Sequence, residues 1–237
     1  MLPTQNQQLA LNVNLRDGYR FKSFYTASKS KNIEIIGILR HFILSKEPQQ
    51  NILWGESSSG KTHLLQACCA KEVETQPSLI YIPLGSSAIY GTEIFSGLSH
   101  YPLIVLDDID TIIGDKQWEI ALFNLINTCR DKQRLLMSSS TNPRQLDCAL
   151  PDLASRLIWG GSYQLHILSD KDKPRALQTR AEQRGFKLND QVIDYLYRRY
   201  PRDIKSLMNI LDKLDKESLR KKSMITIPFV REVLKVS

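Results

Sequence analysis

Residues 55–62 read GESSSGKT and stand between an apolar run, NILW, and an amphipathic stretch, KTHLLQACCAKEVE. They match the pattern G-x-x-x-x-G-K-[ST] at every position, a pattern that links a strand to a helix. The glycines let the backbone curl so that its N–H groups face an anion, the lysine neutralises phosphate charge, and the hydroxyl can ligate Mg²⁺. The start of the following helix adds a partial positive charge. The stretch therefore predicts a phosphate-binding loop made of Gly55, Glu56, Ser57, Ser58, Ser59, Gly60, Lys61 and Thr62.

An apolar run that ends in carboxylates follows this loop. It reads LIVLDDID, residues 103–110, and has the form of a strand whose last residues face a metal. We expect Thr62 and Asp107 to hold Mg²⁺ and Asp108 to orient a water molecule. On its own, a pair of aspartates could equally cap the end of a strand. With the loop, the pair predicts a site for ADP or ATP together with Mg²⁺.

Alternating strands and helices are expected around these two motifs. The apolar runs LIYIPL, RLLMSSS and YQLHIL are separated by helix-like stretches such as QWEIALFNLINTCRD, a pattern typical of an α/β domain with a mainly parallel sheet. After HILSD only helical patterns follow, ending with TIPFVREVLKV. We therefore expect an extended tail over residues 1–17, an α/β nucleotide-binding domain over 18–168, and a small all-helical domain over 169–237.

Composition excludes several classes of protein. No apolar run approaches the roughly 20 residues of a membrane span, and the first residues lack the pattern of a secretory signal, so we expect a cytoplasmic protein. No pair of the four cysteines has the C-x-x-C spacing of a zinc or redox site. We expect buried free thiols in a reducing compartment.

The charge is concentrated near the C-terminus. Residues 169–237 contain 17 Lys and Arg against 10 Asp and Glu, a surplus equal to the net charge of +7 of the whole chain. Such a basic region indicates contact with phosphates or with an acidic protein. A solvated helical surface would have the same composition, and charge alone does not separate the two interpretations.

Taken together, the motifs resemble a known family. The stretches QLALNV, WGESSSGKTHLLQACCA, LIVLDDID, GDKQWEIALFNLIN, PRQLDCALPDLASRLIWG and LSDKDKPRALQTRAEQRGF are similar to the AAA+ core of the bacterial replication initiator DnaA, and most of all to the shorter DnaA-related regulatory inactivators of the Hda group. The most diagnostic stretch is LPDLASRL followed by WG. The resemblance implies an AAA+ P-loop NTPase core with a small C-terminal helical lid.

The resemblance also implies roles for two arginines. The arginine of LASRL, Arg156, matches the arginine finger of the family, which acts on a nucleotide bound by a neighbouring subunit. A guanidinium on a γ-phosphate neutralises charge in the transition state, and fingers supplied in trans are worth about 10³–10⁵ in rate. The alternatives are that Arg156 caps its own helix or pairs with Asp152. Arg202, in YPRDIKS, matches the lid arginine that reaches the bound nucleotide, and its alternative is a solvated arginine near a helix start.

One position departs from the family pattern. Relatives carry an aspartate at the position called sensor 1, where this chain has Ser140. Serine adds no negative charge to polarise an attacking water molecule. We therefore expect a site that holds nucleotide rather than one that turns it over efficiently, and the resemblance implies that this nucleotide is ADP.

The N-terminal stretch QLALNV resembles the short peptide with which proteins dock on the replication sliding clamp. Gln8 would bond at the rim of a pocket that Leu9, Leu11 and Val13 fill, which is a recognised way of capturing an extended peptide. The competing interpretation is a β-strand. The helix-turn-helix domain of the full initiator has no counterpart before Ser237, so we expect no sequence-specific DNA binding, while salt-dependent contact with duplex backbone stays open.

These inferences lead to one main hypothesis and two alternatives. The main hypothesis is an ADP-bound adaptor, associated with the replisome or nucleoid, that docks on the DNA-loaded sliding clamp and stimulates hydrolysis of ATP bound to DnaA, which prevents re-initiation. The alternatives are an autonomous AAA+ ATPase, such as a helicase loader, and a nucleotide-gated DNA-binding module. Phe24 and Tyr25 are candidates for adenine contact or for core packing. A homodimer that hides Arg156 is also open.

Overall fold

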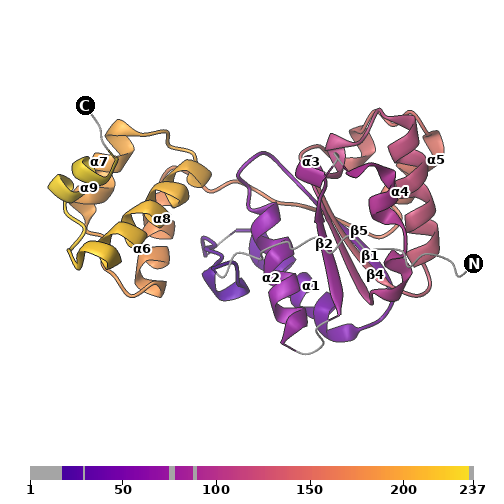
Figure 1. Cartoon of the computed structure of the whole chain (residues 1–237), viewed down its shortest axis with the longest axis horizontal. Helices are drawn as coiled ribbons and strands as arrows, with labels where there is room; N and C mark the ends of the chain where they lie inside the picture. The colour runs from indigo at the N-terminus through magenta and orange to yellow at the C-terminus, as the bar shows by residue number, and fades with distance from the viewer. Residues whose placement is uncertain (1–17, 29, 75–77, 88–89, 235–237) are drawn as a thin grey trace, which may run out of the picture. The chain divides into compact units, whose positions relative to one another are not determined.

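The computed structural model describes residues 18–28, 30–74, 78–87 and 90–234 (Figure 1). They form two compact units, one made of residues 18–21 and 34–165, the other of residues 22–33 and 166–234. The structure thus divides the chain at 165/166, close to the expected boundary at 168/169. It also groups residues 22–33 with the helical unit, whereas the sequence placed them in the α/β domain.

The first unit is built on a parallel sheet of five strands in the order β2-β3-β4-β1-β5. The strands are β1 (Gln49–Trp54), β2 (Leu79–Pro83), β3 (Leu103–Asp107), β4 (Arg134–Ser139) and β5 (Gly161–Gln164). Its α-helices are α1 (Asn32–Ser45), α2 (Lys61–Val73), α3 (Leu84–Ser87), α4 (Lys116–Cys129) and α5 (Pro151–Leu157). Figure 1 shows α1 and α2 on one face of the sheet and α4 and α5 on the other. The predicted α/β class is confirmed.

Short 3₁₀ helices join these elements. They are η3 (Thr92–Phe95), η4 (Leu98–His100), η5 (Ile109–Thr111) and η6 (Pro143–Gln145), with η1 (Phe21–Ser23) near the start of the described chain. η5 follows β3 directly, so the carboxylates after that strand lie on a tight turn.

The central strands are largely buried because helices cover both of their faces. Every residue of β3 and β4 is buried. The register pairs Gln49 with Arg134 at one end of β1 and Trp54 with Ser139 at the other, so β1 and β4 end together at one edge of the sheet. That edge carries the phosphate-binding loop.

The last strand departs from its predicted position. The apolar run YQLHIL predicted a strand over residues 163–168, but β5 spans Gly161–Gln164. One further pairing contact follows, in which the Leu165 N–H donates to the Trp54 carbonyl at 2.7 Å. As an edge strand, β5 has alternating exposure rather than a fully buried run, so its apolar content does not mark its limits.

Helix α1 was not predicted, and it is fixed by a buried ion pair. The Arg134 guanidinium on β4 and the Glu72 carboxylate on α2 form two hydrogen bonds, at 2.6 and 3.0 Å, and both side chains are almost fully buried. Arg134 also donates to the Ile43 carbonyl of α1 at 3.2 Å, and Lys46, just after α1, donates to Glu72 at 2.8 Å. Burial opposes ionisation of Glu72, but the hydrogen bonds from Arg134 and Lys46 lower its pKa overall. This network ties α1, α2 and β4 together.

The second unit is helical, as predicted. It contains α6 (Lys173–Gln183), α7 (Asp190–Arg199), α8 (Ile204–Lys221) and α9 (Ile227–Leu234). Asn189 and Asp203 cap α7 and α8 by accepting the N–H groups of Val192 and Ser206. Gly185 has a positive φ just after α6, as expected for a helix C′ glycine. The core between these helices consists mainly of Leu177, Leu188, Val192, Leu196, Leu207, Leu211, Leu214 and Val230.

The cysteines are free in the described part of the chain, as expected. Burial raises the pKa of the Cys68 and Cys69 thiols well above the usual range and that of Cys129 to about 11. Over residues 18–234, with their gaps, no cluster of three potential metal ligands occurs among His, Cys, Asp and Glu. Among the same residues, no helix is long and apolar enough to cross a membrane.

Candidate nucleotide site

The phosphate-binding loop has the backbone that its sequence predicts. Ser58 and Gly60 both have positive φ, 66° and 98°. Gly55 is also in a region that favours glycine, and a Cβ there would stand 2.3 Å from the Leu165 carbonyl oxygen. Both glycines of the pattern are therefore required by conformation, and Gly55 also by the close approach of another backbone.

Lys61 begins α2 with its side chain turned into the loop. Its Nζ donates to the Gly55 carbonyl at 2.7 Å and to the Glu56 carbonyl at 3.2 Å. Desolvation lowers the pKa of Lys61, and this effect is opposed by the charges of Asp108, Asp110 and Asp107. A cation held inside a loop with this backbone fits a place where phosphate oxygens bind.

Ser59 gives an independent test of that fit. The residue is only 5% exposed, and its Oγ has no hydrogen-bond partner among the described residues. A buried hydroxyl without a partner costs free energy, so a ligand that bonds to it is favoured. Thr62, the next hydroxyl after Lys61, is half-buried at the start of α2. The loop fits a nucleotide's phosphates, and Thr62 and Asp107 are the residues predicted to hold Mg²⁺.

Asp107 is held by two hydroxyl groups that the sequence did not reveal. Tyr81 Oη, on β2, donates to Asp107 Oδ2 at 2.6 Å, and Ser138 Oγ, on β4, donates to Oδ1. Asp107 is 2% exposed, and burial and this carboxylate raise the pKa of Tyr81 far above its usual value. Tyr81 and Ser138 keep the carboxylate oriented at the end of β3. Adjacency of β2, β3 and β4 could have suggested such contacts, but not which side chains make them.

Asp108 adopts a left-handed conformation, with φ of 59°, and its N–H donates to Ser138 Oγ at 2.9 Å. Non-glycine residues with positive φ are uncommon and often belong to functional sites. The turn places Asp108 between the buried Asp107 and the 3₁₀ helix η5. Its proposed part in orienting water stays a prediction.

Three consecutive serines at the end of β4 connect the parts of this site. Ser138 contacts Asp107 and Asp108, as above, while the Ser139 carbonyl accepts the Gly55 N–H of the phosphate loop at 3.2 Å. Ser140, the predicted sensor 1 position, bonds to Asp110: its N–H donates to Asp110 Oδ1 at 3.0 Å and its Oγ donates to Oδ2. The sequence indicated no negative charge at this position, and the structure places a carboxylate there.

Arg156 lies in the last turn of α5 and is partly exposed. Its guanidinium carbon is 5.7 Å from the centre of the Phe123 ring and 4.7 Å from that of Trp159. Within the described part of the chain, no ion pair joins it to Asp152 or to another carboxylate. Its backbone carbonyl accepts a hydrogen bond from Gln50 Nε2 at 2.7 Å. The guanidinium is therefore held by aromatic rings, and its charge is not neutralised by an acid.

A buried carboxylate fixes the loop that leads into α5. Glu119, on α4, is fully buried and accepts three backbone N–H groups, those of Gly114, Ala149 and Leu150, at 2.6–3.0 Å. Leu150 is the N-cap residue of α5. Glu119 thus positions the helix that carries Arg156. The sequence feature that could have indicated this buried carboxylate is a single acidic residue on the apolar face of QWEIALFNLIN. It was not recognised from the sequence.

The remaining predicted site residues belong to the second unit or lie outside the described residues. Arg202 is exposed in the second unit, where its Nε donates to the Tyr197 carbonyl at 3.2 Å, and its contact with nucleotide stays a prediction. Phe24 and Tyr25 are partly buried in that unit. Gln8, Leu9, Leu11 and Val13 lie outside the described residues.

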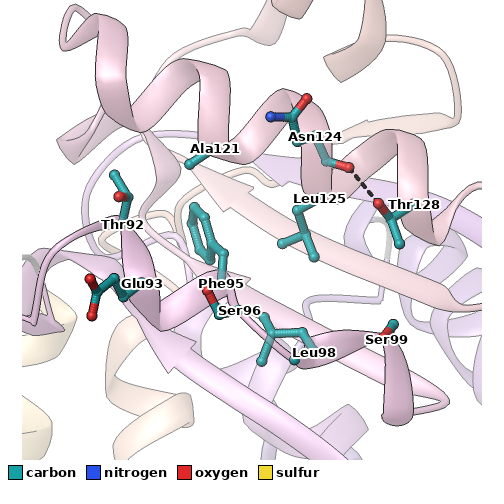
Figure 2. Close-up of a pocket in the computed structure, with 11 residues that line it drawn as sticks. Thr92, Glu93, Phe95, Ser96, Leu98, Ser99, Ala121, Asn124, Leu125 and Thr128 are labelled. Atoms are coloured by element: carbon teal, nitrogen blue, oxygen red, sulfur yellow. Dashed lines mark hydrogen bonds between the residues drawn. The ribbon is translucent and has the colours of Figure 1, made fainter.

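A separate pocket of about 390 Å³ lies between η3, η4 and α4 (Figure 2). Phe95, Leu98 and Leu125 form its apolar part, and Figure 2 shows the Thr128 hydroxyl bonded to the Asn124 carbonyl at its edge. None of the predicted site residues lines it.

Comparisons with known proteins show what the fold and the C-terminal part are similar to. Residues 170–234 match the family described as Hda, lid domain. Domain III of the replication initiation protein DnaA from Thermotoga maritima has a similar structure, with a TM-score of 0.74 and 19% identity, over 93% of this chain and 97% of that one. The chain therefore has the fold of DnaA domain III, and its C-terminal part is similar to the Hda lid.

Two further structures share the AAA+ fold. AMPPCP-bound DnaA from Aquifex aeolicus has a TM-score of 0.64 and 21% identity, over 88% of this chain and 69% of that one. A RuvB variant from Thermotoga maritima has a TM-score of 0.57 and 16% identity, over 91% and 73%. The predicted fold class, an AAA+ core followed by a helical lid, and the resemblance on which it rested are confirmed.

Proposed function

We propose that this AAA+ protein is a regulator of replication initiation that binds ADP and stimulates hydrolysis of ATP held by the initiator DnaA. The observation that carries the proposal is the match of residues 170–234 to the Hda lid, in a chain whose fold is that of DnaA domain III. The phosphate loop, with its inward Lys61 and the unpartnered Ser59 hydroxyl, supports nucleotide binding. Thr62 and Asp107 would hold Mg²⁺, which when bound would neutralise charge on the phosphates.

Arg156 is the residue proposed to act on the partner. Its guanidinium is partly exposed and not neutralised by any described carboxylate, which leaves its charge available to a second molecule. Presented to a γ-phosphate on DnaA, it would stabilise the charge that develops as the phosphoryl group leaves. Gln50 and Glu119 support this role because they fix the two ends of the segment that carries Arg156.

The adaptor proposal also includes docking on the DNA-loaded sliding clamp. Gln8, Leu9, Leu11 and Val13 would bind the clamp, and the basic second unit could contact duplex backbone without reading its sequence. Such a protein would work in the cytoplasm beside the replisome. A pull-down with purified clamp tests this part, with Gln8→Ala expected to reduce capture and Gln5→Ala as the matched control.

The central test mixes ATP-loaded DnaA, DNA-loaded clamp and this protein, and measures released phosphate. Arg156→Ala should reduce the stimulated rate by about 10³-fold or more, as expected for a finger in trans. Arg130→Ala is the matched control, because Arg130 also stacks on Trp159 but at the end of α4. An Arg156→Ala protein that stimulates as well as the wild type would exclude the mechanism.

An autonomous ATPase is the second candidate, favoured by the complete acidic side of the site at Asp107, Asp108 and Asp110. Steady phosphate release by the protein alone, abolished by Lys61→Ala, would support it. The adaptor proposal instead expects little release without DnaA.

A further inference from the structure

The structure gives Asp110 a fixed place beside the phosphate loop. Both of its carboxylate oxygens are bonded to Ser140, one by the N–H and one by the hydroxyl. Ser140 directly follows Ser139, whose carbonyl accepts the N–H of Gly55 at the start of the loop. The carboxylate of Asp110 is therefore attached, through two adjacent residues of one strand end, to the loop that would surround the phosphates.

The charges around the loop are unequal. Lys61 is the cation inside the loop, and the carboxylates of Asp108, Asp110 and Asp107 all act on its ammonium group. Mg²⁺ on Thr62 and Asp107 would offset two of these negative charges. With Lys61 neutralising the third, nothing among these groups remains to compensate the extra negative charge that distinguishes ATP from ADP.

We propose that Asp110, held by Ser140, is a specificity-determining residue that disfavours a third phosphate and so makes the site prefer ADP. The inference rests on the proposed binding of nucleotide and adds the residue that selects its phosphate state. It also gives Ser140 a role: serine there bonds to a neighbouring carboxylate, whereas an aspartate would be repelled by it. One added like-charge contact at a partly exposed site changes affinity by about tenfold.

Calorimetric titration with ADP and with a non-hydrolysable ATP analogue, both at saturating Mg²⁺, tests the inference. Asp110→Asn should strengthen binding of the analogue by about tenfold and leave binding of ADP within about twofold. Because the carboxamide introduced by this substitution can still bond to Ser140, the change removes charge while it keeps the contact. Raising the salt concentration should reduce the preference of the wild type for ADP.

Two further variants separate charge from structure. The double variant Asp110→Asn with Ser140→Asp moves the negative charge across the same hydrogen bond, and should restore the preference for ADP. Asp131→Asn is the matched control, because Asp131 is a highly exposed carboxylate just before the opposite end of β4, and it should not change the ratio of the two affinities.

Three results would overturn the inference. They are an unchanged affinity ratio in Asp110→Asn, an equal loss of both affinities, and a loss of phosphate release from ATP with the ratio unchanged, which would assign Asp110 to water activation. These titrations contain no DnaA or clamp. Failure of the adaptor proposal would instead appear in the stimulated-hydrolysis assay, so the two outcomes are distinguishable.

Discussion

The guanidinium of Arg156 lies over the indole of Trp159, with 4.7 Å between the guanidinium carbon and the ring centre. Trp159 is 43% exposed, and Arg130 lies over the same ring at 3.5 Å. A cation–π contact at an exposed site is worth about 0.5–1 kcal/mol and leaves the cation's charge intact. Trp159 can thus hold the direction of Arg156 without competing for its charge, as a carboxylate would.

Trp159→Ala should therefore weaken the stimulation of DnaA more than it weakens the fold. We expect the stimulated rate to fall by about fivefold, since losing an orienting contact of about 1 kcal/mol has this effect. Thermal unfolding should change little. Trp159→Phe, which keeps an aromatic face, should recover most of the rate. Equal rates for Trp159→Ala and wild type would show that the ring does not orient Arg156.

Glu119→Gln should destabilise the protein by about 2–3 kcal/mol. The carboxylate accepts hydrogen bonds from buried backbone N–H groups, and in the variant an amide nitrogen, itself a donor, would replace one of its oxygens. Denaturant unfolding measures the change. Glu93→Gln, at an exposed position, is the control and should stay within about 0.5 kcal/mol. A second readout is stimulation under conditions where Glu119→Gln is still folded, which should fall because α5 and Arg156 lose their support. If the folded variant stimulates hydrolysis fully, Glu119 contributes to the stability of the fold but not to the positioning of Arg156.

Glu72→Gln should cost about 3–5 kcal/mol of folding free energy, the usual effect of breaking a buried ion pair, because Arg134 would keep its charge without a full partner. Glu74→Gln breaks the exposed pair with Lys71 and should cost about 1 kcal/mol or less. Similar losses for the two variants would mean that the buried network adds little.

The same carboxylate predicts a dependence on pH. Since the folded-state pKa of Glu72 is lowered below its ordinary value of 4.5, its stabilising contribution is complete above that value and is lost as pH falls through the lower folded-state pKa. Wild type should therefore lose stability on acidification below about pH 4.5. Glu72→Gln should show a flatter profile in this window, measured by unfolding at a series of pH values. Parallel profiles for the two proteins would contradict the assignment.

Gly160→Ala and Gly37→Ala should have opposite effects. A Cβ at Gly160 would lie 1.9 Å from the Gln50 carbonyl oxygen, a backbone atom of β1, so the strand or the end of α5 must move. We expect a loss of about 3 kcal/mol or more. Gly37, inside α1, has nothing within 4 Å of such an atom, and alanine there should add up to about 1 kcal/mol. Unfolding midpoints of the two variants provide the test. If Gly160→Ala is as stable as the wild type, the close approach of Gln50 does not explain why glycine follows Trp159.

Local rules were enough to predict much of the fold. The runs that became β1 to β4 and the helix-like stretches that became α2, α4 and α6 to α9 could be read from the sequence because their residue patterns are local. The limits of β5 and the existence of α1 could not. An edge strand lacks a continuous buried run, and α1 is placed by contacts from Arg134 and Glu72, which are distant in the sequence.

The sequence by itself determined the phosphate loop, the acidic strand end and the helical lid, because each depends on residues that are neighbours along the chain. Only the tertiary structure decided which side chains meet. Tyr81 and Ser138 hold Asp107, and Asp110 places a negative charge beside Ser140, which has none. Glu119 supports α5. The physical reason is that parallel strands bring the ends of distant segments to one edge of the sheet. Which side chains then bond across that edge depends on register and on the turns that follow each strand, neither of which a local pattern encodes.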